Sequence, residues 1–217
     1  MNKIVAIDGP AGSGKGTVAK LVAEKCNLVY IDTGATYRCV TLKMLENGID
    51  ISEEDKIIDI AKSIDIIFDE KGRTFLDGID VSDKIRSKEV TKLVSPVSSI
   101  IKLRDIMVDI QRNMAKNRDV IMEGRDITTV VFPDANYKFY LDASLEERAK
   151  RRFEQNKEKN INMSYKEILE NIKKRDYNDM NKPVGALIRT NEQVYIDTTK
   201  MTINEVVDKI VNIIGSE

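Results

Sequence analysis

The chain contains no histidine, no tryptophan and only two cysteines among its 217 residues. Without histidine, imidazole acid-base catalysis, histidine-dependent catalytic triads and histidine metal sites are all excluded. Cys26 and Cys39 form no metal or redox spacing and fall in helical patterns, so we expect buried free thiols. Any chemistry must therefore use carboxylates, lysine, arginine and backbone amides.

The chain also lacks an excess of one charge and a long apolar run. Its 35 lysines and arginines nearly balance 36 aspartates and glutamates, which argues against a nucleic-acid coat or a membrane-surface protein. No run reaches membrane-spanning length, and residues 4–7 are too few apolar residues for the core of a signal peptide. We expect one cytoplasmic globular unit that binds neither nucleic acid nor membrane.

Short apolar runs separated by helical patterns make up most of the chain. The predicted strands are residues 3–8, 28–32, 119–124, 137–143 and 193–198. Capping-box pairs that begin at Ser144, Ser164 and Thr202 mark three helix starts. This alternation predicts a parallel sheet with helices on both faces.

Three segments depart from the alternation or extend it. Residues 64–82 predict two or three short strands of a small antiparallel insert, with Asp77-Gly78 as a hairpin turn. Apolar spacing predicts a long amphipathic helix over residues 98–116. The polar tract 151–163 lies between two capped helices, and we expect it to be an exposed, mobile crossing.

The glycine-rich run DGPAGSGKGT at residues 8–17 directly follows the first predicted strand. Its glycines let consecutive amides turn toward one anion at a helix N-terminus, and Lys15 reaches outer phosphates. Gly16 occupies the usual hydroxyl position, so Thr17 offers its hydroxyl to magnesium instead. The predicted phosphate-binding loop comprises Gly9, Pro10, Ala11, Gly12, Ser13, Gly14, Lys15, Gly16 and Thr17.

Such loops also serve GTPase switches and motor ATPases, so the loop alone does not define the reaction. A guanine-reading N-K-x-D is missing, because Pro183 and Val184 follow Asn181-Lys182. The sequence Gly-Lys-Gly-Thr instead resembles the loop of nucleoside monophosphate kinases.

Three arginine groups are candidates to bind phosphate, two of them at a second phosphate group. Arg38 lies at the first turns of the helix that Thr33 can cap. Arg125 follows a buried strand, where open parallel sheets place ligands. A third group, which a movable lid could bring onto a phosphoryl group, comprises Arg148, Arg151 and Arg152. Ordinary capping, a solvated salt bridge and surface charge are the respective alternatives.

Five tracts together resemble the bacterial cytidylate kinase family: IDGPAGSGKGT, DTGATYR, EGRDITTVVFPDA, LDASLEERAKRR and KKRDYNDMNK. Their order and spacing extend the resemblance over nearly the whole chain. It implies an α/β P-loop kinase with a central parallel sheet flanked by helices, as a single unit over residues 1–217. The implied parts are a core (1–56 and 98–217), an antiparallel monophosphate-binding insert (about 57–97) and a short lid (about 148–164).

The resemblance also implies which residues bind CMP. They are Thr33, Arg38, Ser95, Arg104, Arg125, Asp126, Arg175, Asp179 and Lys182. Arg38 and Arg125 would hold the α-phosphate. A carboxylate at Asp126 suits the exocyclic amine of cytosine, whereas uracil would present a carbonyl there. The family has an arginine where this chain has Lys182, which loses the planar guanidinium. A turn serine, an exposed helix arginine and a solvated carboxylate remain the alternatives for Ser95, Arg104 and Asp179.

We therefore expect transfer of the γ-phosphoryl group of Mg-ATP to CMP or dCMP, a step of pyrimidine nucleotide metabolism. The expected catalytic residues, which neutralise charge, are Lys15, Arg125, Arg148, Arg151 and Arg152. Thr17 is the expected Mg²⁺ contact, and Asp32 and Glu123 are candidates to orient magnesium-bound water. The resemblance favours a monomer. The alternatives are a kinase for UMP, AMP or GMP, and a nucleotide-dependent switch.

Overall fold

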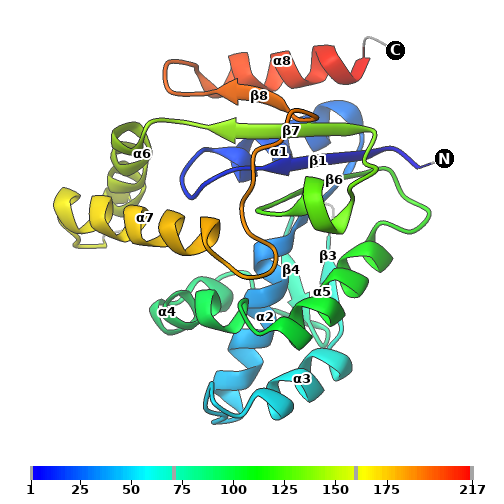
Figure 1. The fold of residues 1–217 in the computed structure, drawn as a ribbon, viewed down its shortest axis with the longest axis vertical. Coiled ribbons are helices and arrows are strands. Elements are labelled where there is room, and N and C mark those ends of the chain that lie inside the picture. Colours follow the sequence, from blue (N-terminus) through cyan, green and yellow to red (C-terminus); the bar gives the residue numbers. More distant parts are fainter. Residues whose placement is uncertain (1, 70–71, 159–160, 216–217) are drawn as a thin grey trace.

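A five-stranded sheet in the order β2-β6-β1-β7-β8 forms the centre of the fold, and each neighbouring pair is parallel (Figure 1). The strands are β1 (Ile4–Asp8), β2 (Val29–Asp32), β6 (Val120–Gly124), β7 (Tyr137–Asp142) and β8 (Val194–Asp197). All five predicted strands are confirmed, each to within one residue at either end.

The structure is a computed structural model that describes residues 2–69, 72–158 and 161–215. The predicted kinase unit, insert and lid therefore include positions outside the described residues, namely 1, 70–71, 159–160 and 216–217. Within the described ranges, no helix is both long and apolar enough to cross a membrane.

Helices cover both faces of the sheet, as predicted. On one face, α1 (Lys15–Cys26) and α8 (Ile203–Gly215) pack side by side on apolar strand residues (Figure 1). On the other face, α5 (Ile101–Met114) and the single π-turn η2 (Ile127–Val131) pack against β1, β2 and β6. Both predicted thiols are free, but only Cys39 is buried; Cys26, the last residue of α1, is half-buried.

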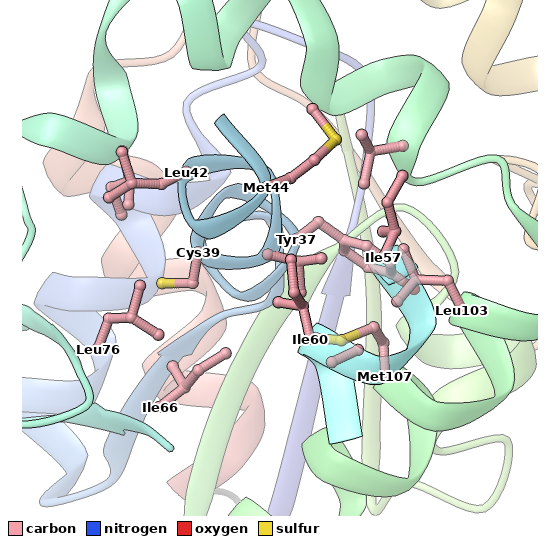
Figure 2. Packing of buried hydrophobic residues seen from close by; sticks show 14 of the residues in the cluster. Tyr37, Cys39, Leu42, Met44, Ile57, Ile60, Ile66, Leu76, Leu103 and Met107 are labelled. Atoms are coloured by element: carbon pink, nitrogen blue, oxygen red, sulfur yellow. The ribbon is translucent and has the colours of Figure 1, made fainter. Parts of the chain in front are cut away.

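The insert builds its own apolar cluster around α2 (Thr33–Glu46), as Figure 2 shows. The helices packed there are α3 (Glu54–Ser63), α4 (Lys88–Val97) and α5, with the short turn η1 (Lys84–Arg86). The predicted small antiparallel sheet consists of β3 (Ile66–Phe68), β4 (Thr74–Leu76) and β5 (Ile79–Asp80). Its second hairpin turns at Asp77 and Gly78, both of which have positive φ.

The helical pair α6 (Leu145–Glu158) and α7 (Tyr165–Met180) corrects one expectation. The predicted crossing at residues 151–163 is helical as far as Glu158, because α6 continues through it. Its lysines, glutamates and arginines are good helix formers, and Phe153 and Ala149 pack on Ile168 of α7. The capping boxes at Ser164 and Thr202 are complete. Ser144 Oγ accepts a hydrogen bond from the Glu147 amide. The Glu147 carboxylate, however, accepts from Arg151 and not from the Ser144 amide, so this capping box is incomplete.

Candidate active site

The polar residues of the site gather where β1, β2 and β6 end. Asp32 and Glu123 are register partners on β2 and β6, and Asp8 pairs with Gly124. Because parallel strands place their carboxyl ends along one edge, the P-loop, the start of α2 and the segment after β6 all emerge there. The sequence-predicted loops are therefore neighbours in space.

Lys15 is the first residue of α1 and is 6% exposed. Its Nζ donates to the carbonyl of Pro10 at 3.2 Å and lies 3.8 Å from Glu123 Oε2. Burial, followed by the charge of Arg125, lowers the pKa of Lys15 to about 8. The ammonium group of Lys15 therefore contacts the loop that precedes it. It lies at the N-terminus of α1, the end of a helix that favours anions.

Gly16 has a steric reason to replace the usual hydroxyl residue. A Cβ at this position would lie 3.0 Å from Glu123 Oε1 and 3.5 Å from the Tyr30 hydroxyl. The glycine therefore allows Glu123 to approach the P-loop closely. Burial, followed by the charge of Asp32, raises the pKa of Glu123.

The residues expected to hold magnesium or its water lie in this part of the site. Among the described residues, no three histidine, cysteine or carboxylate groups form a ready metal cage. Mg²⁺ usually binds through one or two carboxylates together with substrate phosphates and water. Asp32 and Glu123 supply two neighbouring carboxylates, and Thr17 is exposed at the first turn of α1.

Thr33 does not cap α2, which corrects the expectation from sequence. Asp32 is the N-cap, and its Oδ1 accepts from the amide of Ala35 at 3.0 Å. Thr33 instead begins the helix and donates its hydroxyl to the carbonyl of Glu123 at 2.9 Å. A carboxylate caps as well as a hydroxyl does, so Thr33 is available to tie β6 to α2.

Arg38 extends from α2 into the insert, where Nη1 donates to the carbonyl of Ile85 and to Thr91 Oγ1, both at 3.0 Å. Burial, followed by the charges of Arg175 and Arg86, lowers the pKa of Arg38 to about 10. Arg152 adds to the same effect. Arg86 also contacts Asp32 at 3.1 Å, a role that sequence reasoning missed because only the fold brings η1 to β2.

Three positively charged residues that the sequence predicted to bind substrate lie around Asp179, near the end of α7. Its carboxylate lies 2.8 Å from Arg125 Nε, 3.4 Å from Lys182 Nζ and 3.8 Å from Arg175 Nε. Asp179 is 4% exposed. Burial alone would raise its pKa, but these three cations outweigh burial and lower it. The structure therefore brings together four residues that the sequence placed on two separate tracts.

Arg104 and Asp126 form a buried ion pair between α5 and the segment after β6. Burial raises the pKa of Asp126, despite the neighbouring charge of Arg104. Arg104 also donates to the carbonyl of Ser98 at 3.1 Å. Gly185 packs directly on the pair, so that a Cβ there would collide with both groups. Two predicted base-reading residues are thus adjacent.

Ser95, the third predicted base-reading residue, is half-buried in α4. Within the described part of the chain, no hydrogen bond joins its side chain to Arg104 or Asp126, and its carbonyl accepts from the hydroxyls of Ser98 and Ser99. Ser98 reaches the cluster instead, because its hydroxyl accepts from Lys182 Nζ at 3.0 Å. The serine-rich sequence could have drawn attention to Ser98.

Asp8 organises the segment that carries Arg125, and sequence reasoning missed it. It accepts from the amides of Ile127 and Thr128 at 2.9 and 2.8 Å, and from Thr128 Oγ1 at 2.6 Å. Burial raises the pKa of Asp8 to about 6, although these donors oppose the shift. Thr128 is also bonded to the buried Gln193. The sequence signal that could have identified Asp8 is its place as an acidic residue at the end of a buried strand, directly before the P-loop.

The three arginines of the predicted lid have different surroundings. Arg148 is buried and bonded to Asp176 of α7, to Ala11 of the P-loop and to Ala143. Arg151 is half-buried and donates to the hydroxyl and carbonyl of Thr198 at 3.1 and 2.7 Å. Arg152 is exposed. A mobile role therefore suits Arg152 better than Arg148.

Comparison with known proteins places the chain in a family. The family model described as "Cytidylate kinase" matches residues 5–216. The chain is 48% identical to the cytidylate kinase of Caldanaerobacter subterraneus subsp. tengcongensis over 95% of its own length and 92% of that protein. It is also 48% identical to the cytidylate kinase of Clostridium perfringens, over 97% of each chain. An uncharacterized protein from Eubacterium ventriosum shares the fold at 17% identity, with a TM-score of 0.56 and full coverage of both chains.

Proposed function

The chain belongs to the cytidylate kinase family, and from this membership we propose that it transfers the γ-phosphoryl group of Mg-ATP to CMP or dCMP. The products are ADP and CDP or dCDP. One observation supports a two-substrate kinase most directly: Lys15 Nζ lies 3.8 Å from Glu123 Oε2, and Arg125, a candidate for the acceptor phosphate, follows Glu123 by two residues. The cations for two phosphate groups therefore share one electrostatic environment.

The donor side would work mainly through the P-loop. Its backbone amides and Lys15 would bind the phosphates of ATP, with Arg151 and Arg152 from α6 adding positive charge. When bound, Mg²⁺ would neutralise phosphate charge, and Thr17, Asp32 and Glu123 are the residues suited to hold it or its water. A loose transition state needs this neutralisation more than a general base, so the lack of histidine is no obstacle.

The acceptor side would work through charged side chains. Arg38 and Arg125 would bind the α-phosphate, Arg175 and Asp179 the ribose, and Arg104 with Asp126 the cytosine. Arg104 offers hydrogen-bond donors and Asp126 an acceptor. This pattern complements the amine and the acceptor atoms of cytosine, whereas uracil would place a carbonyl against the Asp126 carboxylate. We also infer that residues 57–97 act as the monophosphate-binding insert, and that closure of the lid at about 148–164 excludes water.

The test is an acceptor panel with purified protein and Mg-ATP. CMP, dCMP, UMP, AMP and GMP are supplied separately, and the diphosphate product is followed for the wild type and Asp126→Ala. We expect CMP and dCMP to dominate, and the variant to lose that preference. Dominance of another monophosphate would overturn the proposed acceptor. Slow hydrolysis that no acceptor stimulates would indicate a nucleotide-dependent switch instead.

A further inference from the structure

Arg148 is the point at which three separate elements meet. Its Nε donates to the carbonyl of Ala143, directly after β7, at 2.9 Å. Its Nη1 donates to the carbonyl of Ala11 in the P-loop at 3.1 Å and also binds the carboxylate of Asp176 on α7. Arg148 is 7% exposed and Asp176 is 8% exposed. One guanidinium thus connects the sheet edge, the donor loop and α7.

The contact between α6 and the P-loop is also close at the backbone. A Cβ at Gly12 would lie 3.2 Å from the Cβ of Arg148 and 3.4 Å from its carbonyl oxygen. The loop and the first turns of α6 therefore pack against each other without an intervening side chain. A shift of α6 would displace the loop, because close-packed groups transmit such movements.

The other end of the connection is the helix that carries acceptor-side residues. Asp176 follows Arg175 directly and precedes Asp179 by less than one helical turn. In the described part of the chain, Asp176 Oδ1 is buried without a hydrogen-bond partner. An unsatisfied buried oxygen opposes stability, so stability alone does not account for this pair. Alignment of the elements that it joins is a better explanation.

Building on the phosphoryl transfer proposed above, we propose that Arg148 and Asp176 are positioning residues that hold the P-loop and α7 in register. They would keep the γ-phosphate of ATP in line with the acceptor phosphate without contacting either. In-line transfer depends steeply on this geometry, because a misplacement of about 1 Å can cost roughly 100-fold in rate. The proposal differs from the sequence-based prediction that Arg148 itself contacts the transferring group.

The experiment compares Asp176→Ala, Asp176→Asn and the matched control Glu170→Ala. Glu170 lies on the same helix but is exposed, so its removal changes helix charge without breaking the connection. Asparagine can keep one hydrogen bond to Arg148. CDP and ADP formation give kcat and both KM values, and thermal unfolding reports on folding.

Positioning predicts that Asp176→Ala lowers kcat roughly 30- to 100-fold, keeps the KM for ATP within about threefold and forms ADP in excess of CDP. Asp176→Asn should retain kcat to within about fivefold, as expected for rescue by a conservative variant, and Glu170→Ala should match the wild type. If Arg148 contacts the phosphoryl group instead, Asp176→Ala releases it, and kcat should stay unchanged or rise. That result would overturn the proposal.

Three further outcomes each have a defined meaning. If Asp176→Ala does not unfold cooperatively, Arg148→Lys takes its place, because lysine keeps the pair with Asp176 but loses the planar fork to Ala143 and Ala11. A loss of kcat below about tenfold in that variant would overturn the proposal. If the wild type phosphorylates another monophosphate, the proposed acceptor fails, and the same comparison with that acceptor decides the positioning role. If no acceptor is phosphorylated, both proposals fail.

Discussion

The donor and acceptor sides of the candidate active site differ in how they are built. On the proposed donor side, one continuous run, residues 8–17, forms a glycine-rich loop that leads into α1, and Lys15 is its one cationic side chain. On the acceptor side, the charged groups come from α2, α5, α7 and the segment after β6. A glycine-rich loop is fixed by local conformation, whereas the acceptor side depends on tertiary packing.

The two sides also differ in how their charges are satisfied. Arg104 is paired with Asp126, and Arg125 with Asp179, so the charges of these two acceptor-side arginines are compensated within the protein. Lys15 donates to a carbonyl and lies 3.8 Å from the Glu123 carboxylate, and Arg38 likewise donates to a carbonyl and a hydroxyl. A substrate group that binds Arg104 or Arg125 must therefore compete with an existing ion pair. Changes on the donor side should reduce kcat for every acceptor, whereas changes on the acceptor side should act on CMP.

The largest effect should follow Lys15→Met, which removes the donor-side cation. We expect kcat to fall roughly a thousandfold with every acceptor, because charge neutralisation in the transition state is lost. Diphosphate formation measures this. The melting temperature should not fall, because burial disfavours the charged form of Lys15 and lowers its pKa. A lower melting temperature, or a loss below tenfold, would contradict this account of the donor side.

Arg38→Ala should give a smaller effect that is confined to the acceptor. We expect kcat/KM for CMP to fall roughly 10- to 100-fold, the usual effect of losing hydrogen bonds to a charged group. The KM for ATP should remain within about twofold, because the P-loop is unchanged. Arg73→Ala is the matched control, since Arg73 is a half-exposed arginine of the same insert. An equal rise in the KM for ATP would show that the two sides are not separable.

The pH dependence of the donor side gives a third prediction. In the protein without bound nucleotide, burial lowers the pKa of Lys15 to about 8. The value of kcat/KM for ATP should therefore fall about tenfold per pH unit above pH 8. Bound phosphates favour the charged amine, so kcat itself should decline only at higher pH.

Stability should change in the opposite direction over the same range. Between pH 8 and the ordinary lysine value of 10.5, the folded state binds fewer protons than the unfolded state. The Lys15 contribution to the free energy of unfolding should therefore rise with pH in this window. Comparison with Lys15→Met isolates that contribution. A wild-type kcat/KM profile that is flat up to pH 9.5 would contradict the donor-side pKa.

The same difference between the two sides explains how much could be predicted from sequence. The five strands, the antiparallel insert and the P-loop depend on local pattern and turn chemistry, and the structure agrees with them. The roles of Asp8, Arg86 and Ser98 depend on contacts over long sequence separations, which no local pattern encodes. Family resemblance supplied most acceptor-side candidates, because scattered charges have no signature of their own.

Arg148 and Arg152 illustrate this limit within one helix. Both belong to the tract LDASLEERAKRR, and the sequence offers no reason to separate them. Their positions on α6 differ by one turn, yet Arg148 is buried against α7 and Arg152 is exposed. Residues one turn apart lie on nearly the same helix face, so what separates them is how far along α6 the contacts with α7 and the P-loop extend, which is a property of the tertiary structure. The prediction of a crossing was wrong over residues 151–158 for the same reason, because α6 continues through them.

The smallest effect should follow Lys182→Met, just after α7 on the acceptor side. Lys182 lies 3.4 Å from Asp179 and 3.0 Å from Ser98 Oγ, and burial lowers its pKa. Asp179 would still have Arg125 and Arg175 as partners, so we expect the KM for CMP to rise only about threefold, with kcat unchanged. Lys182→Arg is the control, because it keeps the charge and restores the planar fork. A tenfold loss in Lys182→Met that Lys182→Arg reverses would mean that Lys182 binds the acceptor directly, as Arg38 is proposed to do. The acceptor side would then extend to the segment after α7, and its dependence on scattered side chains would be greater than the ion pairs alone indicate.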